Sequence, residues 1–236
     1  MSLTAGTFSE VSKTTTGTTI TAAHTVLASG ANRVGMVSFG FNNNTGVEPQ
    51  SVSSVSWDGN TVTKLGHDIN CDDGRTELWY IQSDASVVDG DVVGTFNASQ
   101  TSGNASAMGV NDFTDAGTPT GYVGEAKETS GSQMVSPTIT STSGDILYGC
   151  GTLEGGDVTA ATGNTQEAQF NTFGTTEVIS FCVVRKVSSG NGTVEIDCSA
   201  DDHGCISAVN IPEDIALTDP VYDQSDFQIF DGALVD

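Results

Sequence analysis

The sequence has very few basic residues and few long aliphatic ones. Only 7 of its 236 residues are Lys or Arg, against 30 Asp or Glu, so the formal net charge is −23. Such a surface repels phosphate, whereas a nucleic-acid-binding protein needs a basic face, so nucleic acid is not an expected partner. Leucine occurs only 8 times, and with so little Lys and Arg the composition excludes a helix bundle. No run of about 18 apolar residues is present, so no membrane-spanning helix is expected.

The five cysteines do not resemble a disulfide framework or a zinc site. Their number is odd, and no two of them are separated by two residues, as thiolate zinc sites usually require. Cys150 and Cys182 lie in apolar runs and are predicted to be buried free thiols. Cys198 and Cys205 flank an expected turn. They either form a disulfide across a hairpin or stay reduced, and the sequence leaves both possibilities open.

Small polar residues, glycine and valine are abundant. The chain has 25 Ser, 31 Thr, 28 Gly and 24 Val residues, a balance typical of strands joined by turns. Short apolar runs are bounded by Gly, Asn, Asp or Ser, and they predict strands at 18–27, 33–42, 51–57, 60–66, 75–82, 92–97, 105–113, 133–141, 145–153, 177–187, 193–198 and 204–211. A dozen short strands without a convincing helix predict an all-β fold, an antiparallel β-sandwich of jelly-roll type.

The chain is expected to form one domain with an arm at each end. Residues 1–17 are rich in Thr and predict a polar N-terminal arm, residues 18–212 the single β-sandwich domain, and residues 213–236 an acidic C-terminal arm. Residues 114–133 predict a long loop. The C-terminal arm mixes acids with apolar residues, which a purely disordered tail would lack. It packs either on its own sandwich or on a neighbouring subunit, and its expected partner-binding residues are Tyr222, Phe227, Ile229 and Phe230.

The dipeptide Asp58-Gly59 is the clearest local signal in the sequence. Asp-Gly between two strand-like runs favours a two-residue type I′ turn, because both central positions need a positive φ. That register places Val55 opposite Val62. The alternative is an ordinary loop that happens to contain Asp-Gly. At their strand spacing, Trp57 and Trp79 are predicted to be core residues, and stacking on sugar rings is the alternative.

No residue pattern indicates catalysis, a cofactor or a metal ion. His67-Asp68 and Asp202-His203 are adjacent in sequence, and neighbouring strand residues point to opposite faces. A third histidine, His24, has no sequence motif around it, and no Gly-x-Ser-x-Gly motif is present. The acids at 72–73 and at 197, 201 and 202 offer hard oxygen ligands for calcium, but they lack the EF-hand spacing. We therefore expect no enzyme, no cofactor and no metal.

One stretch of the chain resembles a known domain. The segments SVSSVSWDGNTVTKLG, GRTELWYI and VVDGDVVGTF lie within residues 51–96. They resemble a β-sandwich domain of jelly-roll type found in bacteriophage virion structural proteins and in some bacterial surface proteins. The matching positions are packing and turn residues: Trp57, Gly59, Trp79, Tyr80, Asp89 and Gly90. The resemblance covers about residues 18–212 and implies a fold more than an activity.

This resemblance implies a structural role in a virion. The N-terminus has neither a positive region nor an apolar one, so no signal peptide is expected. Together with the acidic composition, this favours a capsid decoration (cement) protein that binds the major capsid protein, forms a homo-oligomer and is located in the virion. The alternative is a carbohydrate-binding receptor module of a tail fibre or surface adhesin, in which Trp57, Trp79 and Tyr80 stack on sugars. A glycan-cleaving enzyme is a third possibility, although no pair of carboxylates identifies one.

Overall fold

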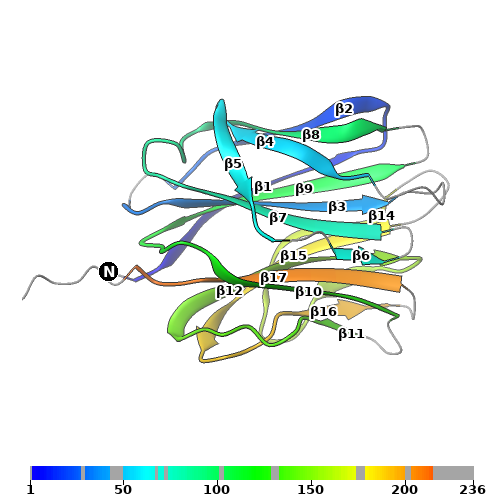
Figure 1. Ribbon diagram of the computed structural model, residues 1–236. Coiled ribbons are helices and arrows are strands. Elements are labelled where there is room, and N and C mark those ends of the chain that lie inside the picture. Colours follow the sequence, from blue (N-terminus) through cyan, green and yellow to red (C-terminus); the bar gives the residue numbers. More distant parts are fainter. Residues whose placement is uncertain are drawn as a thin grey trace, which may run out of the picture.

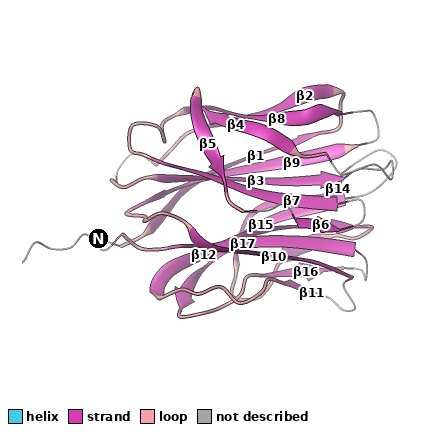
Figure 2. Ribbon diagram, viewed as in Figure 1, coloured by secondary structure: helices cyan, strands magenta, loops and turns pink. Residues whose placement is uncertain are grey.

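The described part of the chain consists of antiparallel strands. The computed structural model describes residues 2–27, 30–42, 50–66, 69–71, 74–100, 104–128, 133–173, 179–199 and 203–214. Within these ranges every regular element is a strand, and the strands form three sheets stacked on one another (Figures 1 and 2). The predicted all-β, antiparallel class is therefore confirmed. The part of the chain that the structure describes also contains no helix long and apolar enough to cross a membrane.

The largest sheet curls into a nearly closed barrel. Its hydrogen-bonded order is β1-β9-β3-β7-β5-β4-β8-β2, and β6 pairs with β7 off this path. The nine strands are β1 (Thr4–Lys13), β2 (Gly17–His24), β3 (Val34–Asn42), β4 (Val52–Trp57), β5 (Asn60–Lys64), β6 (Ile69–Cys71), β7 (Gly74–Gln82), β8 (Gly90–Gln100) and β9 (Ala105–Thr114). The two ends of the path, β1 and β2, lie in contact with each other. They have no ladder of backbone hydrogen bonds between them.

Two smaller sheets cover one side of the barrel-like sheet (Figure 1). The five-stranded sheet has the order β10-β17-β12-β15-β14. Its strands are β10 (Thr120–Glu128), β12 (Ser143–Glu154), β14 (Thr165–Phe173), β15 (Ile179–Ser189) and β17 (His203–Ile211). The outermost sheet, in the order β11-β16-β13, has three short strands, β11 (Gln133–Val135), β13 (Val158–Ala160) and β16 (Glu195–Cys198).

This stacking creates three cores. One fills the barrel-like sheet, one lies between that sheet and the five-stranded sheet, and one lies beneath the three-stranded sheet. Strand β3 shows why its sequence is apolar at consecutive positions. Val37 and Phe39 point into the barrel, while Val34 and Met36 pack against the five-stranded sheet. A strand buried on both faces has no polar alternation.

The β4–β5 hairpin has the turn and the register that Asp58-Gly59 predicts. Asp58 has a φ of 45° and Gly59 a φ of 79°, as a type I′ turn requires. Val55 pairs with Val62 and Trp57 with Asn60. Val55, Trp57 and Val62 are all buried in the barrel core.

Several segments expected to be arms or loops are strands. Residues 4–13, expected within the N-terminal arm, form β1 and pair with β9. Residues 120–128, expected within a long loop, form β10 and pair with β17. The jelly-roll arrangement is a finer statement than the all-β class, and the observed strand order does not establish it.

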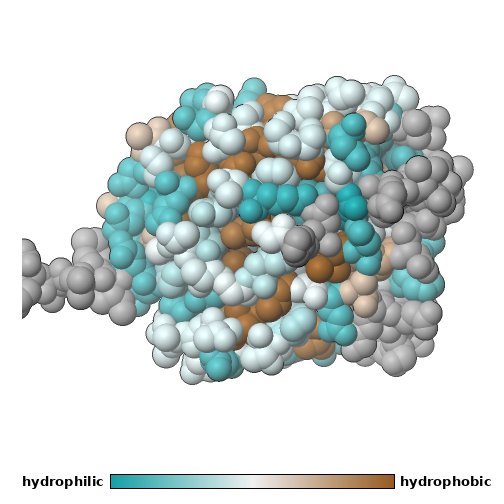
Figure 3. All heavy atoms as spheres, viewed as in Figure 1, coloured by the Kyte–Doolittle hydropathy of each residue, from teal (hydrophilic) through white to brown (hydrophobic). Residues whose placement is uncertain are grey.

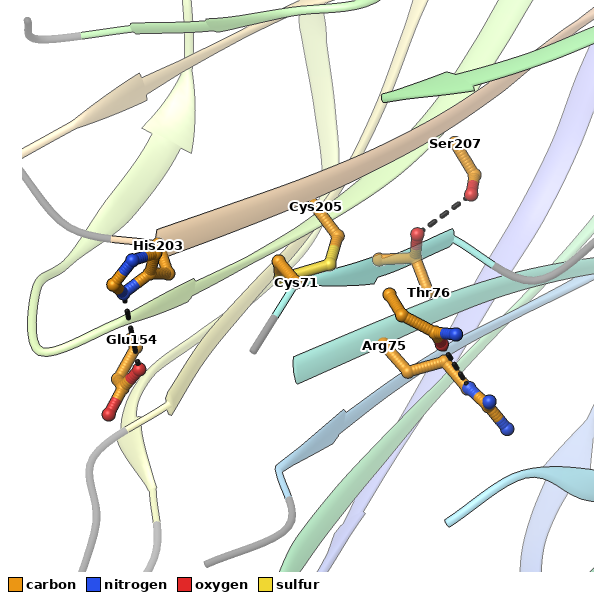
Figure 4. Close-up of a disulfide and its surroundings, with 8 residues drawn as sticks. Cys71, Arg75, Thr76, Glu154, His203, Cys205 and Ser207 are labelled. Atoms are coloured by element: carbon orange, nitrogen blue, oxygen red, sulfur yellow. Dashed lines mark hydrogen bonds and ion pairs between the residues drawn. A yellow bond between two sulfur atoms is a disulfide. The ribbon is translucent and has the colours of Figure 1, made fainter. Parts of the chain in front are cut away.

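A disulfide joins two layers of the fold. Cys71 on β6 and Cys205 on β17 are bonded, with their Cα atoms 5.6 Å apart (Figure 4). Next to this bond, the hydroxyls of Thr76 and Ser207 lie 2.7 Å apart across the same two sheets. Cys205 is therefore not bonded to Cys198, the partner that the sequence left open. Cys150, Cys182 and Cys198 are free and buried, and burial raises the pKa of each thiol.

Candidate functional site

Both described ends of the chain lie at one end of the molecule. Thr4, where β1 begins, pairs with Thr114, where β9 ends. The Asp214 amide donates to the carbonyl of Asp115 over 2.9 Å, so the last described residues sit beside the same strand end (Figure 1). We call this the terminal end and define it by the loops at 25–27, 30–33, 58–59, 83–89, 115–119 and 212–214. Residues 215–236 therefore follow in sequence from the terminal end.

The predicted partner-binding residues follow directly in sequence but lie outside the described residues. These are Tyr222, Phe227, Ile229 and Phe230. Among the described residues, Val187 is the one large hydrophobic side chain that is exposed, at 66%. On the face shown in Figure 3, apolar atoms show at several separate places among polar ones. The apolar atoms on this face are therefore interspersed with polar ones.

The few cations of the described chain are mostly paired with carboxylates. Lys64 Nζ lies 3.0 Å from Glu77, and Arg75 lies 4.0 Å from the same carboxylate. Arg33 lies 3.8 Å from the buried Asp112. Arg185 pairs with Glu167 in the same way. Because these cations are already paired, they leave the exposed carboxylates with little compensating charge.

A buried polar network ties β1 to β2 where backbone pairing is missing. His24 Nδ1 lies 3.0 Å from Ser9 Oγ, and His24 Nε2 lies 3.3 Å from Asp112 Oδ1. The Asp112 carboxylate also accepts the backbone N–H groups of Thr7 and Leu27, each over 2.9 Å. Burial raises the pKa of Asp112, but the hydrogen bonds from His24, Leu27 and Thr7 outweigh it, so the pKa lies below its usual value.

This network has the order of a Ser-His-Asp triad but not the exposure that catalysis needs. The side chains of His24 and Asp112 have no exposed surface, and the indole of Trp57 lies edge-on against the imidazole, with ring centroids 5.1 Å apart. A substrate would have to enter the barrel core to reach His24. The network instead supplies the side-chain hydrogen bonds that close the barrel-like sheet.

Sequence reasoning missed this network because its members carry no spacing signal. Ser9, His24 and Asp112 come from three different strands. They meet only because β1 and β2 lie at the two ends of the strand path and the sheet curls. The sequence does show one trace of the network, because His24 and Asp112 both lie in segments that predict strands.

The two tryptophans are core residues. Trp57 and Trp79 are buried, and their indole nitrogens donate to the carbonyl of Val88 and to the carboxylate of Glu77. Neither ring is placed to stack on a sugar from solvent. Tyr80 is partly buried against the second core. Trp57, Trp79 and Tyr80 therefore do not form together an exposed aromatic platform.

The described residues contain no cluster of three or more His, Cys, Asp or Glu side chains arranged to hold a metal ion. Asp197 accepts a hydrogen bond from Gln133. His203 lies 4.0 Å from Glu154 (Figure 4). The remaining residues considered for calcium or as histidine pairs, His67-Asp68, Asp72-Asp73 and Asp201-Asp202, lie outside the described residues.

Comparisons with family models, with curated proteins and with solved structures find no match to this chain.

Proposed function

We propose that the chain is a structural protein of a bacteriophage virion, specifically a capsid decoration protein. In this proposal it binds the major capsid protein as a homo-oligomer, stabilises the shell and has no enzymatic activity. Its sheets would then be a variant of the jelly-roll-type sandwich, which the layered antiparallel architecture supports.

The observation that carries the proposal is the position of the two chain ends. The first described strand begins, and the last one ends, at the terminal end. Residues 215–236 follow in sequence from there and contain four large apolar residues, Tyr222, Phe227, Ile229 and Phe230. An extended arm gains much interface per residue once it is ordered on a partner. One end of the molecule thus holds the segment best suited to attachment.

The disulfide and the charge also support a role on the outside of a particle. Disulfides persist in oxidising surroundings and are rare in reducing cytoplasm, and the Cys71–Cys205 bond links two layers of this fold. The net charge of −23 disfavours binding to packaged nucleic acid. A shell component that meets the external medium fits both features.

The test replaces Tyr222, Phe227, Ile229 and Phe230 by Ser in the full chain and measures binding to undecorated capsids. Burying each of these side chains contributes about 1.5–3 kcal/mol before ordering costs, so we expect binding to weaken by ~100-fold or more. The melting temperature should stay unchanged, because residues up to 214 make the described contacts.

Two controls separate the arm's apolar residues from its charge and from its own fold. Replacing Asp219, Asp223, Asp226 and Asp231 by Asn changes charge at constant length and should cost less affinity, because such charges fix register more than strength. Ending the chain after Asp214 should leave a folded protein that no longer binds. Unfolding of that truncated chain would show that residues 215–236 pack on the sheets of their own chain. Undiminished capsid binding by the Ser variant would show that a different part of the protein binds the capsid.

A further inference from the structure

A groove at the terminal end combines apolar walls with two fixed carboxylates. Its volume is about 500 Å³, and it is lined by Thr25, Val26, Leu27, Arg33, Asp84, Val87, Val88 and Asp89. It lies between the loop that follows β2 and the loop between β7 and β8. The half-buried Val26, Leu27 and Val88 provide the walls, while Val87 is buried in the barrel core. Asp84 and Asp89 are exposed to solvent.

Hydrogen bonds hold both loops in place. Asp84 Oδ1 accepts the Arg33 backbone N–H over 2.7 Å, and Asp89 Oδ1 accepts the Val26 backbone N–H over 2.8 Å. The carbonyl of Val88 accepts the Trp57 indole N–H over 2.8 Å. Within the part of the chain that the structure describes, the second oxygen of each carboxylate, Oδ2, has no hydrogen-bond partner. The groove is therefore already formed without a guest, which lowers the entropy cost of binding.

The groove has an excess of negative charge. Its single cation, Arg33, lies beside the buried Asp112 and donates to the carbonyl of Leu27 over 2.6 Å. Arg33 therefore does not neutralise Asp84 and Asp89. Two further exposed carboxylates, Asp58 and Asp91, lie on the adjoining hairpin and strand, with the Asp58 amide bonded to the carbonyl of Asp91 over 2.9 Å. A cationic guest would relieve the repulsion among these groups.

We propose that this groove binds a Lys or Arg side chain from an extended segment of the partner protein. The aliphatic stem of such a side chain packs along apolar walls while its cationic head stays at a polar rim. Here the half-buried Val26, Leu27 and Val88 receive the stem, and Asp84 and Asp89 receive the head. The proposal rests on the proposed function only in taking that partner to be a shell protein, and it adds the chemistry that the partner must present at the terminal end.

The test uses a short peptide in place of the shell. The probe is the N-acetylated and C-amidated pentapeptide Ala-Val-Lys-Val-Ala, and its neutral match carries Nε-acetyl-lysine. Both are titrated into the full chain at physiological salt, and backbone amide shifts are followed by NMR. We expect saturable shifts at Val26, Leu27, Val87 and Val88 with the lysine peptide, and affinity at least ~10-fold lower with the acetylated one.

A matched pair of double variants tests the two carboxylates. Asp84→Asn/Asp89→Asn keeps an oxygen that accepts each loop hydrogen bond and should lower the lysine peptide's affinity by ~10-fold or more. Glu10→Gln/Glu125→Gln makes the same change in net charge on β1 and β10 and should have a much smaller effect.

Four results would overturn the proposal. They are equal binding of the two peptides, equal weakening by the two double variants, shifts spread over the whole surface, and the same shifts produced more tightly by calcium. None of them bears on whether the arm binds capsids. If the arm variants lose capsid binding but still bind the lysine peptide normally, the arm and the groove act independently. The two proposals can therefore fail separately.

Discussion

Glycines inside the strands make room for aromatic rings of the neighbouring strands and layers. A Cβ on Gly35 of β3 would lie 2.5 Å from the ring of Trp57, and one on Gly94 of β8 would lie 2.7 Å from Phe39. Interiors are packed densely, and such an overlap must be relieved by moving a ring or a strand. The high glycine content therefore reflects packing in part, and not only turns.

Gly59 has the opposite environment, because a Cβ there would meet nothing within 4 Å. Its φ of 79° nevertheless disfavours any β-branched residue. We expect Gly59→Val to lower the free energy of unfolding by ~1–3 kcal/mol through backbone strain alone. Urea denaturation monitored by tryptophan fluorescence measures this. Gly59→Asn, which tolerates positive φ, is the matched control and should cost much less. Equal stability of the valine variant and the native chain would contradict the turn's importance.

At the scale of elements, the sequence predicts the strands that carry long apolar runs and misses some strands that carry none. Strands β3, β9, β12 and β17 carry apolar runs and lie close to their expected ranges. Strand β1 has no fully buried residue, and β14 is rich in Gln and Thr. These strands are held by edge pairing with β9 and β15, and that pairing depends on partners distant in sequence.

The disulfide was equally beyond the reach of sequence. Cys71 and Cys205 are 134 residues apart, and only the stacking of β6 on β17 brings them together. Cys198 is the nearer cysteine in sequence, but it lies in the outermost sheet, in the core beneath that sheet. The polar network at His24 and Asp112 could not be predicted for the same reason, because the order of strands in the sheet decides which side chains meet. The Asp58-Gly59 turn was predictable because its cause is local.

Removing the disulfide should destabilise the fold strongly. A crosslink over so long a separation stabilises a protein by roughly 2–5 kcal/mol, chiefly by restricting the unfolded chain. We therefore expect Cys71→Ser to lower the free energy of unfolding by that amount, measured in urea without reductant. Cys198→Ser, which removes a free buried thiol, is the control and should behave much more like the native chain.

Alkylation of the unfolded, unreduced protein checks the same assignment directly. Three cysteines should be labelled, namely Cys150, Cys182 and Cys198. A labelled Cys205, or a peptide linking Cys198 to Cys205, would contradict the Cys71–Cys205 disulfide.

At the scale of the whole molecule, several of the few cations are paired with buried carboxylates, while most of the remaining carboxylates are left without a cation. Glu77 and Asp112 are buried and draw Lys64, Arg75 and Arg33 toward themselves. The three stacked cores provide the apolar burial that holds the sheets together. The net charge of −23 acts against that burial, because like charges on a compact surface repel one another.

This balance predicts that moderate salt stabilises the protein. At physiological ionic strength screening shortens the range of charge interactions to about 8 Å, which weakens repulsion between separate exposed carboxylates more than it weakens the buried pairs. The melting temperature should therefore rise by several degrees between ~10 mM and ~150 mM sodium chloride. A variant with Asn at Asp58 and Asp84 of the terminal end and at the adjoining Asp91, all three exposed, should melt higher at low salt and respond less to added salt. A melting temperature of the native chain that does not change with salt concentration would mean that its carboxylates repel one another only weakly. Binding of a cationic partner at the terminal end would then relieve little electrostatic repulsion.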